Sequence, residues 1–300
     1  MLPVFVNIGE KMEYRIKFGE VVLAIQSERE IKVEPELLPF MDKEQGTPDV
    51  DVSVSWDWEK ARKPLAAMVG QDLIQNYYIE DEGAFCMTRG GPKGYVAGTW
   101  YTKDFRKMEC AINEKPFLIK EKTLGQILRF LPIRGLLQHF QVLFFHASQI
   151  MVGEKGILFS APSGTGKTTQ ANLWKQYEGA TLVCNDRTLI RCMDGRWKTF
   201  GYPIDGSAPV RSSTVNELGC VVYLSQAKEN DVERMYGAGA IAALMPQLVI
   251  DIWSSQSRER AMELLIGLLQ DIPIYHLHCT PTKESVDCLK EMLRKDGVLE

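Results

Sequence analysis

The stretch LFSAPSGTGKTTQANLW has the residue types and the spacing that bind phosphate. It fits the phosphate-loop pattern G-x-x-x-x-G-K-[ST], except that Ala161 stands where the first glycine usually stands. Gly164 and Gly166 allow the backbone to turn its N–H groups toward an anion, and Lys167 adds a mobile positive charge. An apolar run precedes the loop and a helical pattern follows it, as this mode of binding requires. The sequence therefore predicts a nucleoside triphosphate site formed by Ser163, Gly164, Thr165, Gly166, Lys167, Thr168 and Thr169.

A phosphate loop of this kind works with a magnesium ion, which takes a further oxygen ligand from an acidic residue. Asp186 ends the apolar run TLVCND, about one helix and one strand after Lys167, whereas no carboxylate follows the later apolar run CVVYLSQ. This spacing disfavours motor-type and transporter-type ATPases, whose metal-binding acid normally comes later. We expect Thr168 and Asp186 to share Mg²⁺ with ATP, and Asp186 is also a candidate proton acceptor. The alternative is that Asp186 only forms a turn or a cap.

These residues resemble the HPr kinase/phosphorylase-like kinases, which share a nucleotide-binding core with phosphoenolpyruvate carboxykinases. The segments SGTGKTT, NDRTLI and FFHASQIMV carry the resemblance, and FGYPIDGS and IPIYHLHCTPTKESVDCLKEML are similar to segments of bacterial members found with peptide-maturation systems. It covers roughly residues 120–300 and implies a kinase core with ATP and Mg²⁺. The chain departs from the family pattern at Asn185, which precedes Asp186 where members commonly carry adjacent acids. The C-terminal basic segment used for phosphorylase action is also not evident.

The resemblance gives roles to further residues. Lys167 would bridge the β and γ phosphates, and Lys167, Asp186 and His146 form the expected catalytic set. His146 would act as a positioning or acid–base group beside the γ-phosphate, although a lone histidine in an apolar strand is more often a satisfied core residue. Possible phosphate or substrate contacts are Arg187, Gly201, Pro203 and Gly206, of which the last three read as a rigid turn in GYPIDGS.

The surrounding sequence predicts an α/β fold: a P-loop kinase core with a mixed sheet flanked by helices, preceded by a smaller β-rich domain. Residues 1–120 show alternating short runs separated by turn signals, and they form the expected N-terminal domain, which would help to recognise the acceptor. Residues 121–300 form the expected nucleotide-binding domain, where strands alternate with helical segments. Pro132 divides the first helical segment into two short helices.

Composition limits the partners. A formal net charge of -4 without a long Lys/Arg block predicts no nucleic acid partner and no anionic membrane surface. We find no secretory signal and no apolar segment of spanning length, which predicts a soluble, cytoplasmic protein. The seven scattered cysteines contain no C-x-x-C pair, so reduced buried thiols are expected. His276 and His278 share one face of a strand, but no third metal ligand is visible and a structural role is expected.

The leading interpretation is an ATP- and Mg²⁺-dependent kinase that phosphorylates a Ser or Thr hydroxyl on a small protein or precursor peptide. Catalysis would come mainly from positioning and from charge neutralisation. Two alternatives stay open. The acceptor could be a small metabolite, such as free serine or a sugar, because only the acceptor pocket separates these activities. The protein could also bind ATP without transferring phosphate, as a peptide carrier or sensor, which the single acid at position 186 favours.

Overall fold

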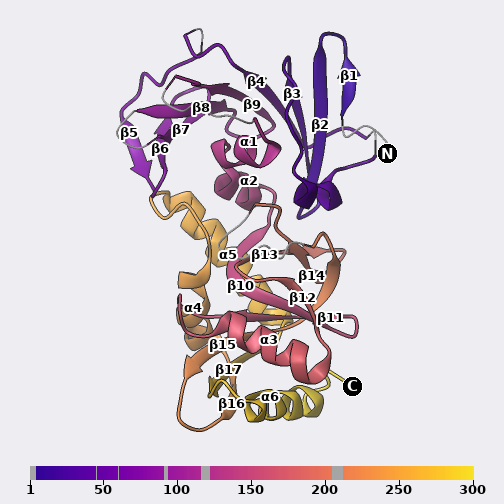
Figure 1. Cartoon of the computed structure of the whole chain (residues 1–300). Helices are drawn as coiled ribbons and strands as arrows, with labels where there is room; N and C mark the ends of the chain where they lie inside the picture. The colour runs from indigo at the N-terminus through magenta and orange to yellow at the C-terminus, as the bar shows by residue number, and fades with distance from the viewer. Residues whose placement is uncertain (1–4, 45, 60, 91–93, 116–121, 205–211) are drawn as a thin grey trace. The chain divides into compact units, whose positions relative to one another are not determined.

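The computed structural model describes residues 5–44, 46–59, 61–90, 94–115, 122–204 and 212–300. Its contacts divide the chain into two compact units, one of residues 1–140 with 251–255, and one of residues 141–250 with 256–300. Each unit contains a mixed β-sheet and helices, so the α/β class predicted from the sequence is confirmed (Figure 1). The helical segment 122–140, which the sequence analysis grouped with the C-terminal domain, packs in the first unit, where α1 contacts β7 and β8.

In the described part of the first unit, nine strands form one sheet in the order β1-β2-β3-β4-β9-β8-β7-β6-β5. Strand β4 runs parallel to β3 and to β9, and the other neighbouring pairs are antiparallel. Burial alternates along β4, because successive side chains of a strand point to opposite faces. The strands are β1 (Val6–Ile8), β2 (Lys11–Phe18), β3 (Val21–Ser27), β4 (Val50–Ser55), β5 (Met68–Gln71), β6 (Gln75–Ile79), β7 (Ala84–Arg89), β8 (Tyr95–Tyr101) and β9 (Lys107–Ile112).

The described part of this unit also contains two short helices, α1 (Leu124–Phe130) and α2 (Ile133–His139), and the 3-10 helix η1 (Pro35–Phe40). Pro132 separates α1 from α2, as predicted. Helix α1 begins with a capping box in which the Thr123 hydroxyl accepts the Gln126 N–H and the Gln126 side chain accepts the Thr123 N–H. This exchange satisfies backbone donors that the first turn of a helix leaves without partners.

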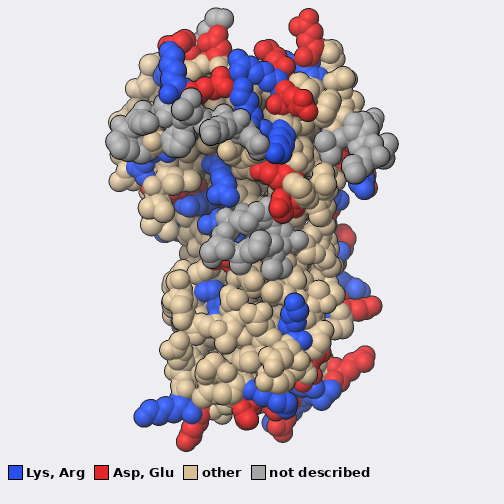
Figure 2. All heavy atoms as spheres, viewed as in Figure 1, with Lys and Arg blue, Asp and Glu red and all other residues tan. Residues whose placement is uncertain are grey.

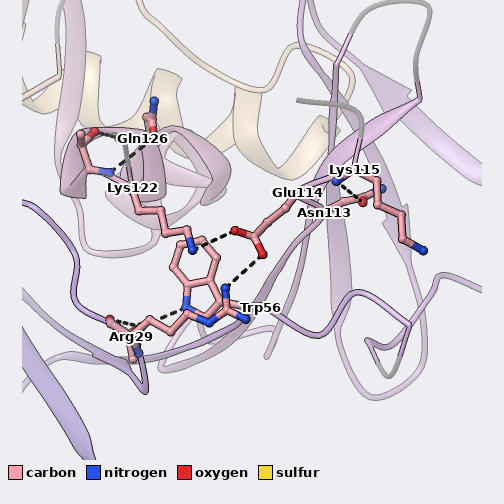
Figure 3. Close-up of polar contacts among 9 residues, drawn as sticks. Arg29, Trp56, Asn113, Glu114, Lys115, Lys122 and Gln126 are labelled. Carbon is pink, nitrogen blue, oxygen red and sulfur yellow. Dashed lines mark hydrogen bonds and ion pairs between the residues drawn. The ribbon is translucent and has the colours of Figure 1, made fainter. Parts of the chain in front are cut away.

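Close to this cap, Glu114 joins two cations that also lie against an indole ring (Figure 3). Its carboxylate accepts from Lys122 at 2.8 Å and from Arg29 at 3.0 Å. The Lys122 ammonium lies 4.5 Å from the Trp56 ring centroid, and the Arg29 guanidinium carbon lies 5.6 Å from it. The bond from Lys122 is the main reason why the pKa of Glu114 lies below its usual value. The cluster is partly exposed to solvent, so it orients these segments more than it stabilises them.

The second unit contains an eight-stranded sheet in its described residues, with the order β11-β10-β13-β14-β15-β17-β16 and with β12 paired to β10. Strand β15 runs parallel to β11 and β17, whereas β10 is antiparallel to β11. The strands are β10 (Leu143–Val152), β11 (Lys155–Ser160), β12 (Thr181–Cys184), β13 (Arg187–Met193), β14 (Arg196–Gly201), β15 (Val215–Gln226), β16 (Asp231–Met235) and β17 (Ile274–Cys279). The helices are α3 (Lys167–Glu178), α4 (Gly237–Leu244), α5 (Ser255–Asp271) and α6 (Lys283–Lys295), with the 3-10 helix η3 (Met245–Gln247).

Two apolar clusters pack against this sheet. One joins Phe159 and Leu277 of the sheet to Trp174 of α3 and Leu289 of α6. The other joins sheet residues to α4 and α5, with buried members Leu143, Val221, Ile274, Leu244 and Leu265. Successive residues of β15 alternate between the clusters, so α3 with α6 and α4 with α5 cover opposite faces of the sheet. The mixed sheet flanked by helices that the sequence predicted is therefore present.

The charged surface is mixed. On the visible and described surface, acidic and basic side chains are interspersed, and Lys and Arg form no continuous patch (Figure 2). None of the helices within the described ranges is both long and apolar enough to cross a membrane.

Candidate phosphate-binding site

The phosphate loop lies between the end of β11 and the start of α3, because the apolar β11 sequence stops at Ser160 and a run of small residues follows. Gly164 has φ 80° and Gly166 has φ 120°, a backbone region in which a side chain is strained. Gly166 caps α3, and its carbonyl accepts the N–H of Gln170 at 2.9 Å. The first N–H groups of a helix have no partners within it, so the start of α3 offers donors to an anion.

The Lys167 ammonium lies on the loop itself. It donates to the carbonyl of Ala161 at 2.9 Å and to that of Pro162 at 3.3 Å. Lys167 is buried, and burial lowers its pKa, while the nearby carboxylate of Asp186 raises it. The Lys167 ammonium therefore already lies at the loop. A bound triphosphate would have to compete for it with the two carbonyl oxygens.

Strand pairing brings His146 and Asp186 together. Strand β10 pairs with β13 so that His146 lies opposite Arg187, and the next residue, Ala147, lies opposite Ser160 at the end of β11. The His146 Nε2 lies 3.2 Å from the Asp186 Oδ1, and the Arg187 Nε lies 3.7 Å from the other carboxylate oxygen. Asp186 thus contacts both an imidazole and a guanidinium beside the phosphate loop.

The protonation of His146 follows from these neighbours. Burial is the main cause of its lowered pKa, and the positive charges of Lys167 and Arg187 act in the same direction, whereas Asp186 raises it. The ring is therefore mainly neutral at neutral pH. When Nε2–H donates to Asp186, the other ring nitrogen is an acceptor that can take a proton. This is the arrangement of a general base oriented by a carboxylate.

A cavity of about 280 Å³ unites these groups. Its lining contains His146, Ser163, Gly164, Gly166, Lys167, Thr168, Thr169, Asn185 and Asp186. The donors available to Mg²⁺ are oxygens, as this hard ion requires: the Thr168 hydroxyl, the Asp186 carboxylate and the Asn185 amide. The Asn185 Oδ1 is buried and has no hydrogen-bond partner among the described residues. This unpaired oxygen beside a carboxylate fits a cation, so the residues present are compatible with magnesium.

The other residues predicted to contact phosphate or substrate do not line this cavity in the described part of the chain. Arg187 approaches Asp186 but does not line the cavity. Gly201 ends β14 and pairs with Thr188 of β13, and Pro203 follows in a bend, and neither residue lines the cavity. Gly206 lies outside the described residues. Thr165 lines a neighbouring cavity rather than this one.

Sequence reasoning missed Gln226 and the second cavity. The Gln226 amide at the end of β15 donates to the carbonyls of Thr165 at 3.3 Å and Gly164 at 3.5 Å. It stands beside a cavity of about 450 Å³ lined by Pro162, Ser163, Gly164, Thr165, Tyr223, Leu224, Ser225 and Gln226. The two cavities share Ser163 and Gly164, so a ligand that extends along the loop meets both. The position of Gln226 depends on the parallel pairing of β15 with β11, which the sequence alone does not show.

Comparisons with known proteins give only a weak likeness to solved structures. No protein family model matches the chain, and no curated protein sequence matches it. Among solved structures, the chain is similar to the HPr(Ser) kinase/phosphatase from Coxiella burnetii, with 12% sequence identity and a TM-score of 0.33. The match covers 51% of this chain and 98% of that chain. This similarity is too low to assign a family, so the function is argued from the residues of the site.

Proposed function

We propose that the protein is an ATP- and Mg²⁺-dependent kinase that transfers the γ-phosphoryl group to a Ser or Thr hydroxyl of a small protein or precursor peptide. The observation that carries the proposal is the meeting of Lys167, Thr168, Asp186 and His146 around one cavity at the start of α3. A phosphate-binding loop alone would support only binding, whereas a neutral imidazole paired with a carboxylate beside it supplies a proton acceptor. The acceptor class comes from the sequence resemblance.

In this proposal each residue has a separate task. The N–H groups at the start of α3 and the Lys167 ammonium hold the phosphate oxygens, where negative charge is greatest. Thr168, Asp186 and Asn185 would hold Mg²⁺, which neutralises phosphate charge when bound. His146 takes the proton of the acceptor hydroxyl while the acceptor oxygen forms its bond to the γ-phosphorus. The bond from that phosphorus to the oxygen shared with the β-phosphate breaks, and ADP leaves.

The test is phosphate transfer from radiolabelled ATP to peptides and small proteins with hydroxyl side chains, with free serine and sugars as parallel acceptors. We expect labelled peptide from the unaltered chain, and Lys167→Ala should abolish the labelling. Lys175→Ala is the matched control, because Lys175 is an exposed lysine in the last turn of the same helix and should leave transfer unchanged. Full transfer by Lys167→Ala would refute the site, and labelling of serine or sugars alone would refute the acceptor class.

A second function has one observation in its favour. Among the described residues that line the cavity, Asp186 is the only carboxylate, and Asn185 stands beside it. A protein with a single acid could bind ATP as a peptide carrier or sensor without transferring phosphate. His146→Gln separates the two functions, because a kinase would keep its ATP affinity and lose transfer. Tight ATP binding without turnover on any acceptor would favour the carrier.

A further inference from the structure

We propose that Glu233, His276 and His278 bind a divalent transition-metal ion of the zinc type. One nitrogen of each imidazole and a carboxylate oxygen of Glu233 all lie within 4.8 Å of one another. These three residues line neither of the two cavities beside the phosphate loop, although Ser225 next to them lines the larger one. Imidazole nitrogen and carboxylate oxygen are the donors that zinc takes in sites with three protein ligands and one open position.

The sheet brings the three side chains together. Residues 276 and 278 alternate on β17, so their side chains share one face. Strand β16 runs antiparallel to β17 and pairs Glu233 directly opposite His276, which puts the carboxylate on that same face. The sequence analysis found the histidine pair but missed β16, and it therefore found no third ligand.

The distances suit closure around an ion. The Glu233 Oε1 lies 3.8 Å from the His276 Nδ1 and 3.8 Å from the His278 Nε2. Bonds of about 2.0–2.1 Å in a tetrahedral site put ligand atoms about 3.3 Å apart. The two ring nitrogens, which lie within 4.8 Å of each other, must reach the same spacing, and the carboxylate must approach each of them by about 0.5 Å. It can do so because the Glu233 side chain is 63% exposed, and this exposure also gives the ion a path of entry.

Ser225 orients the imidazole rings of His276 and His278 from the side opposite to Glu233. Its hydroxyl lies 2.9 Å from the His276 Nε2 and 2.8 Å from the His278 Nδ1, which are the two ring nitrogens that do not face Glu233. A hydroxyl oxygen has two lone pairs and can accept from both rings at once. Each imidazole then carries its hydrogen toward Ser225 and its lone pair toward Glu233. Zinc-binding histidines commonly have such a partner on the second nitrogen, because it fixes the tautomer and the ring orientation.

The probe is the metal alone, added to the untagged full-length chain. We expect Zn²⁺ titrated against a chromophoric chelator to show one tight site per chain. Co²⁺ should give the visible absorption of a tetrahedral site without thiolate charge-transfer bands. The double substitution His276→Ala with His278→Ala should remove the site. Ser225→Ala, which leaves all three ligands, should weaken Zn²⁺ binding by about 10-fold to 100-fold.

Glu229→Gln is the matched control for Glu233→Gln, because Glu229 is exposed in the turn just before β16. The control should keep full zinc affinity, whereas Glu233→Gln should lose most of it. Equal affinity in these two variants, or an unchanged site in the double histidine variant, would overturn the proposal. Thiolate bands in the Co²⁺ spectrum would also overturn it, because they would place the ion on a cysteine such as the exposed Cys192.

Discussion

The buried carboxyl of Asp251 gives the first unit a stability that depends on pH. Asp251 is 6% exposed, and its Oδ1 finds no hydrogen-bond partner among the described residues. Burial raises its pKa from 3.8 to about 6, although the positive charge of Arg134 acts in the opposite direction. Arg134 stabilises the ionised Asp251 carboxyl only weakly, because its guanidinium already forms an ion pair with Asp72 at 2.8 Å. The ionised form of Asp251 is therefore disfavoured in the folded state.

The sign and size of the effect follow from this raised pKa. Well below pH 4 the carboxyl is protonated in both states and imposes no penalty, and the penalty grows between about pH 4 and pH 6 and levels off above that. A shift of about two units corresponds to about 3 kcal/mol in the free energy of unfolding. We expect Asp251→Asn to be more stable than the unaltered chain by up to about 3 kcal/mol at pH 8, and to have no such advantage at pH 4.

The assay is urea denaturation of both proteins at half-unit steps from pH 4 to pH 8, comparing the unfolding free energies. The difference isolates this carboxyl because all other titrating groups are shared. Asp104→Asn is the control, since the Thr102 hydroxyl donates to Asp104 and lowers its pKa from 3.8, so its contribution is lost only below about pH 4 and should stay nearly constant over this range. A difference between Asp251→Asn and the unaltered chain that stays constant from pH 4 to pH 8 would refute the reasoning.

Three further substitutions test the packing and the loop. Trp174→Ala removes a fully buried indole from the cluster between α3 and the sheet, and calorimetry should show a loss of about 3–5 kcal/mol. Gly70→Ala places a Cβ 2.2 Å from the Trp253 Cγ, and thermal unfolding should show a loss of about 1–3 kcal/mol. Gly166→Ala meets no side chain closer than 4.0 Å but strains φ 120°, so calorimetric titration should show weaker ATP binding; unchanged affinity would contradict the assigned loop geometry.

Local sequence pattern was sufficient for much of the second unit. The glycine-rich turn before Lys167 and the helix that begins at Lys167 each carry their own turn or capping chemistry, and the structure has them there. The interruption between α1 and α2 at Pro132 could also be predicted from local sequence, because proline cannot continue a helix. In the first unit the alternating runs predicted strands, but not their order in the sheet.

Long-range pairing was the part that sequence could not supply. Strand β16, with the sequence DVERM, is short and mostly charged. It forms a strand because its backbone pairs with β17. That pairing places Glu233 beside His276, 43 residues further along the chain. The contact between His146 and Asp186 also depends on the register of β10 with β13, which no single segment determines. Residues 251–255 belong to the first unit through another long-range contact, because the Trp253 ring stacks on the Tyr77 ring.

The end of β15 contributes to both proposed sites, and Ser225, which contacts both imidazoles, also lines the larger cavity beside the phosphate loop. Gln226 donates to the phosphate loop, whereas its neighbour Ser225 contacts the two imidazoles. Adjacent residues of a strand point to opposite faces, and the clusters agree: Leu224 belongs to the face covered by α3, while Tyr223 packs on the face covered by α4 and α5. A zinc ion at Glu233 would then lie on the face opposite Gln226. Loss of the zinc ligands should therefore leave the Gln226 contacts with the loop in place, so that the two proposals stand or fall by separate measurements.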